Sequence, residues 1–267
     1  MILTLGFSTC PNDTFMFDAL VNGKIDTEGI QFQVFYHDIE NLNKKAFDYD
    51  LDITKISYNA LTFCTKNYAL LDSGSALGYN VGPLLVKLPE HEINEKSLIG
   101  IPGRYTTANM LFEFAFPNYI NKKEFVFSDI ENAVINKNID AGLVIHESRF
   151  TYQKLGLKKV IDLGEHWGKK TDLPIPLGGI VVKRNISKAL QYKINDLVRK
   201  SIEYAFQNPD SSRQYIKKHA QEMNEYVIKS HIDLYVNNFS ISLGKKGKMA
   251  VEHVFKKSNK FHSKIFI

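Results

Sequence analysis

Strand patterns alternate with helix patterns along the first half of the chain, and this alternation limits the fold more than any other feature of the sequence. Ile2–Phe7 has the apolar composition of a buried strand, and Asp13–Asn22 carries apolar residues at helical spacing. The succession continues with strand patterns at Ile30–Tyr36 and Leu51–Ile56 and helix patterns at Ile39–Phe47 and Tyr58–Thr65. Because such alternation is typical of βαβ units, the sequence predicts an α/β fold with mainly parallel or mixed sheets flanked by helices.

A second set of patterns begins near Ser97. It predicts strands at Leu98–Ile101, Glu124–Phe127, Ile139–Ile145 and Lys159–Leu163, with helices at Thr107–Ala115 and Asp129–Asn136. A further apolar strand is expected at Gly178–Val182, before a long amphipathic helix at Ser187–Asn208 that Pro209 ends. Three shorter helices are expected near 210–221, 224–236 and 247–258.

This order fits two lobes, the first made of residues 1–86 and 180–267 and the second of residues 87–179. Two crossings would then join the lobes, near Pro83–Lys87 and Pro174–Val182, where Pro and Gly stand beside apolar strand residues. The alternative is one continuous doubly wound sheet.

Composition narrows the class of partner. The net charge is +5, and only five of the 34 basic residues are Arg. A nucleic-acid binder more often shows a clustered Arg/Lys face, so we expect no nucleic-acid partner. A mildly basic chain can instead attract an anionic small molecule, and we expect a small carboxylate substrate. Nothing in the sequence predicts an oligomeric state.

The N-terminus and the cysteines indicate a compartment. The apolar start Met1–Phe7 is short and has no Lys or Arg before it, so it does not read as a signal peptide, and no apolar run approaches the ~20 residues of a membrane span. Cys10 and Cys64 form neither a disulfide framework nor a metal-ligand cluster. We therefore expect a cytoplasmic protein that does not enter a membrane.

Four segments share one layout, in which small or polar residues follow an apolar strand. They are Ser8–Asp13, Lys55–Ser57, Gly103–Thr107 and Ile145–Ser148. In parallel α/β sheets ligands bind at the carboxyl ends of strands, and helix N-termini there favour a carboxylate or a hydroxyl-rich ligand. Taken singly, each segment is better explained by plain helix capping by Ser, Thr, Asn or Asp, but four such segments at strand ends together favour a site. No phosphate-loop motif is present.

His146 is the strongest catalytic candidate, because it follows the apolar strand directly and histidine titrates near neutral pH. A histidine hydrogen-bonded at a strand end is the alternative. Glu147 and Arg149 could orient it or bind an anion, or be solvated loop charges. The remaining histidines lie in polar loops or helix patterns without zinc-site spacing: His37, His91, His166, His219, His231, His253 and His262.

Cys10 is a second candidate, as a nucleophile at a helix start or as a small residue lining a site beside Asn12 and Asp13. Packing or lining is favoured, because no histidine partner for Cys10 is visible in the sequence.

Several motifs together resemble the dihydroxynaphthoate synthase family. They are Gly6-Phe-Ser-Thr-Cys-Pro-Asn-Asp-Thr-Phe-Met-Phe17, Lys55-Ile-Ser-Tyr58, Gly142-Leu-Val-Ile-His-Glu147, Asp172-Leu-Pro-Ile-Pro-Leu-Gly-Gly179, and Tyr235-Val-Asn-Asn-Phe-Ser240 followed by Leu243-Gly244. The match spans nearly the whole chain in order. One departure is His166, which stands where we expect an aromatic residue.

The resemblance implies a two-lobed periplasmic-binding-protein-like (type II) fold with an active site in the cleft. It implies a lyase of menaquinone biosynthesis (futalosine pathway) that converts cyclic de-hypoxanthinylfutalosine to 1,4-dihydroxy-6-naphthoate and dihydroxyacetone. His146 would be the proton acceptor, and the substrate-binding residues would be Lys55, Ile56, Ser57, Thr107 and Ala108. The chemistry requires no redox cofactor and no metal.

Two other functions remain open. A solute-binding protein of a transport system would share the lobes but would need export and no base. Chorismate dehydratase acts in the same pathway, but the Cys-Pro-Asn-Asp and Ile-His-Glu motifs favour the synthase.

Overall fold

The computed structural model describes residues 1–220, 224–258 and 264–267. The chain divides into two compact units, unit 1 with residues 1–78 and 176–267 and unit 2 with residues 79–175. The expected boundaries after residues 86 and 179 differ from these. Strand β6 (Leu84–Lys87) pairs with strands of unit 2, and residues 178 and 179 pair with a strand of unit 1, so hydrogen bonding shifts both boundaries toward the N-terminus.

Unit 1 contains a six-stranded mixed sheet in the order β2-β1-β3-β11-β4, with β5 paired to β11. The strands are β1 (Ile2–Phe7), β2 (Gln31–Tyr36), β3 (Ile53–Ser57), β4 (Tyr68–Leu70), β5 (Ala76–Gly78) and β11 (Ile175–Lys183). β1 runs parallel to β2 and β3, whereas β11 runs antiparallel to β3 and β4. The carboxyl ends of β1 and β3 therefore lie at the same edge of the sheet.

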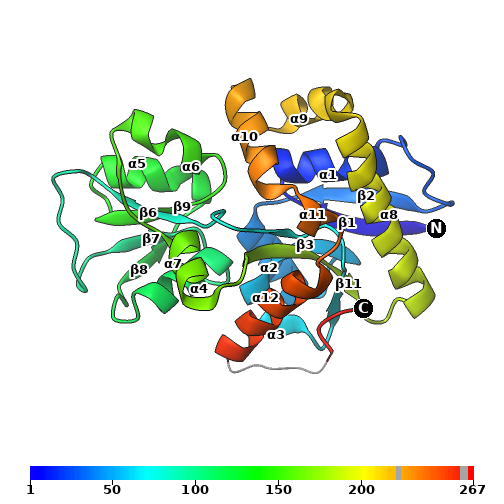
Figure 1. Cartoon of the computed structure of the whole chain (residues 1–267), viewed down its shortest axis with the longest axis horizontal. Coiled ribbons are helices and arrows are strands. Elements are labelled where there is room, and N and C mark those ends of the chain that lie inside the picture. The colour runs from blue at the N-terminus through cyan, green and yellow to red at the C-terminus, as the bar shows by residue number, and fades with distance from the viewer. Residues whose placement is uncertain (221–223, 259–263) are drawn as a thin grey trace. The chain divides into compact units, whose positions relative to one another are not determined.

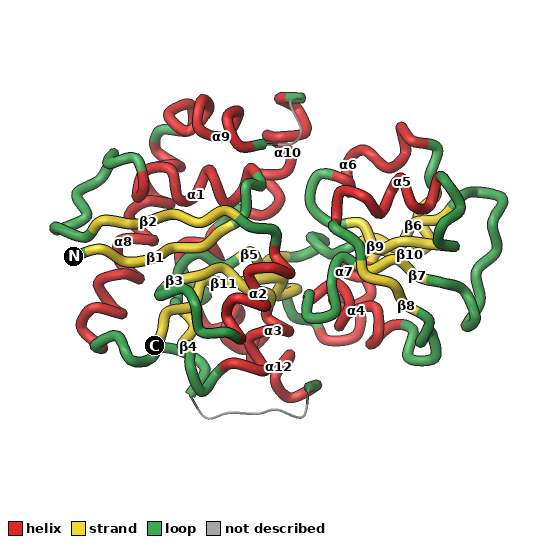
Figure 2. The backbone as a smooth tube through the Cα atoms, turned by 180° about the vertical axis from the view of Figure 1, so that it is seen from behind, coloured by secondary structure: helices red, strands yellow, loops and turns green. Residues whose placement is uncertain are grey.

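Helices cover both faces of this sheet (Figures 1 and 2). They are α1 (Pro11–Val21), α2 (Ile39–Phe47), α3 (Tyr58–Cys64), α8 (Lys188–Gln207), α9 (Arg213–His219), α10 (Glu225–Tyr235), α11 (Asn238–Ile241) and α12 (Gly244–Lys257), with a 3-10 turn at Pro209–Ser212. α1 and α8 share one apolar core with β1 and β11, which includes Phe7, Met16, Ile180 and Leu197. On the other face Gly6 allows close packing, since a Cβ there would lie 2.9 Å from Leu42 of α2.

Unit 2 contains a five-stranded sheet in the order β10-β6-β9-β7-β8. Besides β6, its strands are β7 (Ile99–Ile101), β8 (Lys122–Glu124), β9 (Ala141–Val144) and β10 (Lys158–Asp162). Its helices are α4 (Thr107–Ala115), α5 (Ile130–Ile135), α6 (Ser148–Thr151) and α7 (Leu163–Thr171), with 3-10 turns at Phe127–Asp129 and Tyr152–Leu155. Gly142 of β9 lets α5 pack closely, because a Cβ at this position would lie 2.3 Å from Ile130.

Some expected elements differ from the structure. The strand expected at Glu124–Phe127 lies earlier in the chain, at β8. Phe127 instead begins a 3-10 turn, and its ring packs against His146. The sheets are more mixed than the alternation suggests, because β6 and β11 run antiparallel to their neighbours. Residue 221, the expected end of a helix, and His262 lie outside the described residues. Within the described part of the chain, no helix has both the length and the apolarity to span a membrane.

Candidate active site

A buried carboxylate organises the loop that joins β1 to α1. The Asp13 side chain is fully buried and accepts hydrogen bonds from the Ser8 amide at 3.2 Å and the Ser8 hydroxyl at 2.6 Å. Its other oxygen accepts from the Asn12 side-chain amide at 2.9 Å. These bonds hold Ser8 and Asn12 against the first turn of α1. Asp13 therefore fixes the conformation of the segment Ser8–Asp13, which the sequence analysis predicts to be part of a site.

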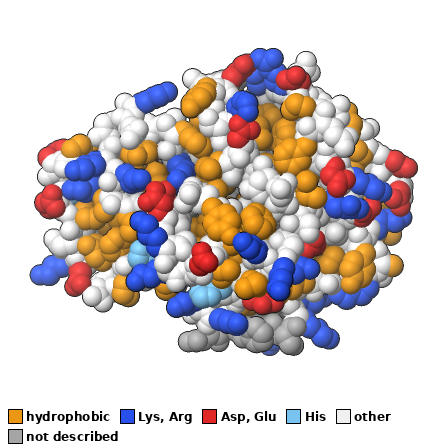
Figure 3. Space-filling view, in the orientation of Figure 1, with side chains coloured by type: hydrophobic (Ala, Val, Ile, Leu, Met, Phe, Trp, Pro, Cys, Tyr) orange, Lys and Arg blue, Asp and Glu red, His pale blue; other side chains and the backbone are white. Residues whose placement is uncertain are grey.

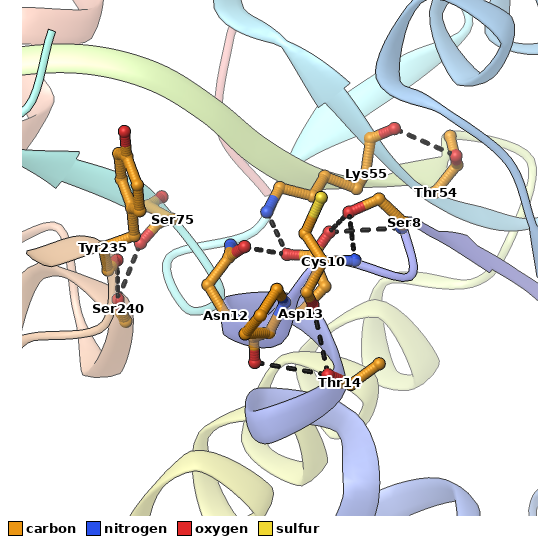
Figure 4. Close-up of polar contacts among 11 residues, drawn as sticks. Ser8, Cys10, Asn12, Asp13, Thr14, Thr54, Lys55, Ser75, Tyr235 and Ser240 are labelled. Atoms are coloured by element: carbon orange, nitrogen blue, oxygen red, sulfur yellow. Dashed lines mark hydrogen bonds and ion pairs between the residues drawn. The ribbon is translucent and has the colours of Figure 1, made fainter. Parts of the chain in front are cut away.

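Lys55 pairs with the same carboxylate (Figure 4). It lies on β3, and its side chain is 7% exposed while that of Asp13 is 0% exposed. A lysine is rarely buried without a partner, because removing its charge from water is costly. The ion pair with Asp13 therefore explains how a charged residue is tolerated in a strand that is buried along its whole length.

Ser57 ends β3, and its surroundings contradict a capping role. It is the N-cap residue of α3, yet its side chain makes no cap hydrogen bond. Its hydroxyl instead accepts from the side-chain amide of Asn43 at 3.1 Å, and the Asn43 carbonyl accepts from the Ser57 amide at 2.9 Å. The hydroxyl proton of Ser57 thus remains as a donor, beside the fully buried Ile56.

Capping also fails to explain the loop before α1. The N-cap there is Cys10, which makes no side-chain cap bond, and Pro11 follows it.

In unit 2 the cap of α4 is Thr106, whose hydroxyl accepts from the Asn109 amide at 3.2 Å. Thr107 and Ala108 are the first two residues of that helix, where backbone N–H groups lack intrahelical acceptors.

His146 has the most unusual backbone of the predicted site residues. Its φ is 55°, in the left-handed region that few non-glycine residues adopt. It lies two residues beyond the end of β9 and is half-buried, and its ring contacts Phe127 edge to face with centroids 4.9 Å apart. Backbone strain of this kind concentrates at functional sites, where the surrounding structure holds it in place.

Two anchors on α6 hold the turn that follows His146. The Ser148 hydroxyl donates to Glu131 of α5 at 2.6 Å. Arg149 donates to Asp162 at 2.6 Å, to the Asn80 carbonyl at 3.0 Å and to the Gly82 carbonyl. Arg149 is thus engaged in structural bonds within unit 2 rather than solvated.

The sequence analysis did not identify Glu131 or Asn43, and little in the sequence could have revealed them. Both sit in ordinary amphipathic helices, and their partners lie 17 and 14 residues away. Burial raises the pKa of the Glu131 carboxyl. Asp13 and Lys55 carried a usable signal, because a charged residue in the buried strand Ile53–Ser57 requires a partner.

Cys10, His146 and Glu147 carry side chains of types that can ligate metals, whereas Lys55, Ser57 and Thr107 are suited to binding organic oxygen atoms. Cys10 and Glu147 are both buried. His166, the departure from the family pattern, packs edge to face on Phe114 with centroids 5.9 Å apart, as an aromatic residue would.

Cys64 is expected to be chemically inert. Burial raises the pKa of its thiol to about 12, and thiols react as thiolates. Iodoacetamide near pH 8 should therefore leave Cys64 unmodified in the native protein and alkylate it in urea. Peptide mass mapping measures both states, and rapid alkylation of the native protein would contradict the assignment.

Charges of both signs are mixed on the molecular surface. On the face drawn in Figure 3, Lys and Arg side chains are interspersed with Asp and Glu rather than gathered in one basic patch. Exposed ion pairs follow the same pattern, as between Glu225 and both Arg213 and Lys217, each at 2.6 Å. This distribution among the described residues favours a small-molecule ligand over a polyanion.

A family model and two curated relatives place the chain in the same family. Residues 3–260 match the family described as menaquinone biosynthesis. A Thermus thermophilus protein named 1,4-dihydroxy-6-naphtoate synthase is 40% identical over 253 residues, covering 95% of this chain and 92% of that protein. A Streptomyces coelicolor protein of the same name is 39% identical over 254 residues, covering 93% and 90%.

Solved structures show the fold. A crystal structure from Archaeoglobus fulgidus has a TM-score of 0.91 at 32% identity and covers 97% of both chains. The ligand-binding component of a Staphylococcus aureus ABC-type import system has a TM-score of 0.72 at 13% identity, covering 98% of this chain and 93% of that one. A Candida albicans protein described as having the generic periplasmic-binding-protein fold has a TM-score of 0.68 at 14% identity, covering 100% and 97%. The expected periplasmic-binding-protein-like fold is confirmed.

Proposed function

This chain belongs to the menaquinone biosynthesis family, and on that premise we propose that it is a 1,4-dihydroxy-6-naphthoate synthase. It converts cyclic de-hypoxanthinylfutalosine to 1,4-dihydroxy-6-naphthoate with release of dihydroxyacetone. The observation that carries this proposal is His146, a histidine held in a left-handed backbone conformation two residues after the end of β9. The relatives that share this name, at 39% and 40% identity over most of the chain, support it.

His146 acts as the general base. A neutral imidazole accepts a proton from the carbon beside a substrate carbonyl, which starts elimination and carbon–carbon cleavage. Aromatisation of the product supplies the driving force, so the chain itself needs to supply a base, orientation of the substrate and exclusion of water. The reaction as proposed requires neither a redox cofactor nor a metal. We place the enzyme in the cytoplasm, where its free cysteines would stay reduced.

Lys55, Ile56, Ser57, Thr107 and Ala108 bind the substrate. Ser57 supports this role because its hydroxyl proton is not used in capping. Thr107 and Ala108 support it because they begin α4, where backbone N–H groups lack intrahelical acceptors.

Ser57→Ala and Thr107→Val should each weaken substrate binding about tenfold or more, since a hydrogen bond to a charged group contributes roughly 1.5–3 kcal/mol. Calorimetry on each folded variant, made in the His146→Asn background to slow turnover, measures the affinity. Thr106→Val is the matched control, because it removes the cap and should lower thermal stability more than affinity. Unchanged affinity in both site variants would rule out their binding role.

A solute-binding protein is the main rival, because two structural neighbours, at 13% and 16% identity, are described as a component of an ABC-type import system and as an ABC transporter. That likeness shows the fold alone. A trace of protein incubated with excess cyclic de-hypoxanthinylfutalosine, or separately with chorismate, distinguishes the candidates. We expect mass spectrometry to show many turnovers of the first compound and none of the second. Stoichiometric binding without turnover would support the rival, and dehydration of chorismate would support the other enzyme.

A further inference from the structure

The buried ammonium of Lys55 is already neutralised within unit 1. Asp13, fully buried, pairs with it and accepts three further hydrogen bonds from Ser8 and Asn12. A carboxylate ligand next to Lys55 would therefore meet a second carboxylate without a spare positive charge. Like charges at short range in a poorly solvated site repel strongly. This position does not suit the acid group of a ligand.

Two groups around Asp13 have hydrogen-bonding capacity that the described residues do not use, one as a donor and one as an acceptor. An ammonium carries three N–H donors, and Asp13 is the one partner of the Lys55 ammonium among the residues that the structure describes. The Asn12 side chain is 3% exposed, and its Oδ1 has no hydrogen-bond partner in the described part of the chain. A buried polar atom left in this way costs about 1–3 kcal/mol unless a ligand or water satisfies it.

The orientation of the Asn12 amide follows from its neighbour. Asp13 can only accept, so the nitrogen of Asn12 must face it, at 2.9 Å. The oxygen then faces away from Asp13. Figure 4 shows the Asn12 amide and the Lys55 ammonium converging on this carboxylate from different elements, α1 and β3. The Asn12 amide, which has a free acceptor, and the Lys55 ammonium, which has free donors, thus bind the same oxygen, Asp13 Oδ1, near the carboxyl ends of neighbouring strands.

We propose that Asn12 and Lys55 together bind one neutral hydroxyl group of the substrate and that its carboxylate is bound elsewhere. The hydroxyl donates to Asn12 Oδ1 and accepts from Lys55 Nζ, which satisfies both unfilled groups at once. A carboxylate cannot donate to Asn12, and a methyl group can do neither. Asn12 is then a specificity-determining residue.

We assign this hydroxyl to the fragment that leaves as dihydroxyacetone, and this assignment rests on the proposed function. The hydroxyl groups of the naphthoate fragment are the alternative, which the affinity for that product tests. Dihydroxyacetone has two hydroxyl groups and no charge, so it matches the donor–acceptor pair. The naphthoate fragment carries the acid group, which the neutralised Lys55 does not attract.

The test compares two small neutral ligands, dihydroxyacetone, which carries hydroxyl groups, and acetone, which carries none. Ligand-observed NMR gives the dissociation constant of each without any turnover. Wild-type protein should prefer dihydroxyacetone by about fivefold or more, the order expected for a hydrogen bond to a charged group. In Asn12→Leu this preference should fall to about onefold, while the affinity for 1,4-dihydroxy-6-naphthoate stays within about twofold of wild type.

Asn22→Leu is the matched control. It removes a similar amide–carboxylate bond, from Asn22 to Asp18 at 2.7 Å, at the opposite end of α1. This variant should keep the wild-type preference. If Asn12→Leu does not fold, Asn12→Ala takes its place, and comparing two ligands on one folded protein remains valid.

Three outcomes would overturn the inference: no preference in wild type, an unchanged preference in the Asn12 variant, or a selective loss of naphthoate affinity. Failure of the proposed function is seen separately, as absence of turnover of cyclic de-hypoxanthinylfutalosine by wild-type protein.

Discussion

His146→Asn is expected to lower the rate of the chemical step about 10²–10⁴-fold, because an amide cannot accept the proton that general base catalysis removes. The fold should survive this change for a specific reason. Residue 146 has φ 55°, and asparagine is one of the few residues that tolerate this left-handed conformation well. Most of the substrate affinity should also remain, since Asn keeps a polar side chain.

Melting temperature and single-turnover rate on the same preparation separate this account from a structural role for His146. If the histidine only stabilised the turn beside Phe127, the variant would melt at a lower temperature and turn over at a nearly normal rate per folded molecule. Phe127→Leu is a useful companion, because it removes the ring contact and leaves the base in place. A stable and fully active His146→Asn protein would make Glu147 or Cys10 the next candidate for the base.

Asp13→Ala is expected to lower the free energy of unfolding by about 3–5 kcal/mol, the usual cost of leaving a buried charge without its partner. The variant leaves the buried Lys55 ammonium, the Ser8 amide and the Asn12 side-chain amide without the carboxylate that they bind in the wild type. Urea unfolding followed by circular dichroism measures the loss.

Two further variants identify the cause of that loss. Asp13→Ala combined with Lys55→Met should recover part of the stability, because the uncompensated charge is gone. Glu225→Ala breaks two exposed ion pairs, with Arg213 and Lys217, and should have a much smaller effect. A loss below about 1 kcal/mol in Asp13→Ala would show that the ion pair does not hold the loop.

Local patterns predicted the long elements of this fold well. Residues 39–47 and 107–115 are helical as expected, because their apolar spacing and their caps, Asp38 and Thr106, agree. The three-residue strands β4 and β5 escaped prediction because so short a segment has no recognisable period. Helix α7 was missed because Gly164, Gly168 and two lysines interrupt its apolar face.

The candidate site shows the same limit. The position of His146 after an apolar strand is a local pattern, and so it was visible in the sequence. Its left-handed backbone and its contact with Phe127 depend on packing between elements and were not. The pair of Asp13 and Lys55 joins residues 42 positions apart, which becomes evident only once β1 and β3 are known to be neighbours.

The most direct test of the proposed activity is the product balance of wild-type protein with cyclic de-hypoxanthinylfutalosine. Protein at catalytic concentration, without added cofactor, is sampled over time for 1,4-dihydroxy-6-naphthoate and dihydroxyacetone. The account predicts that both appear in equal amounts, over many turnovers, as the substrate is consumed. Substrate returned unchanged, or naphthoate formed without dihydroxyacetone, would contradict it.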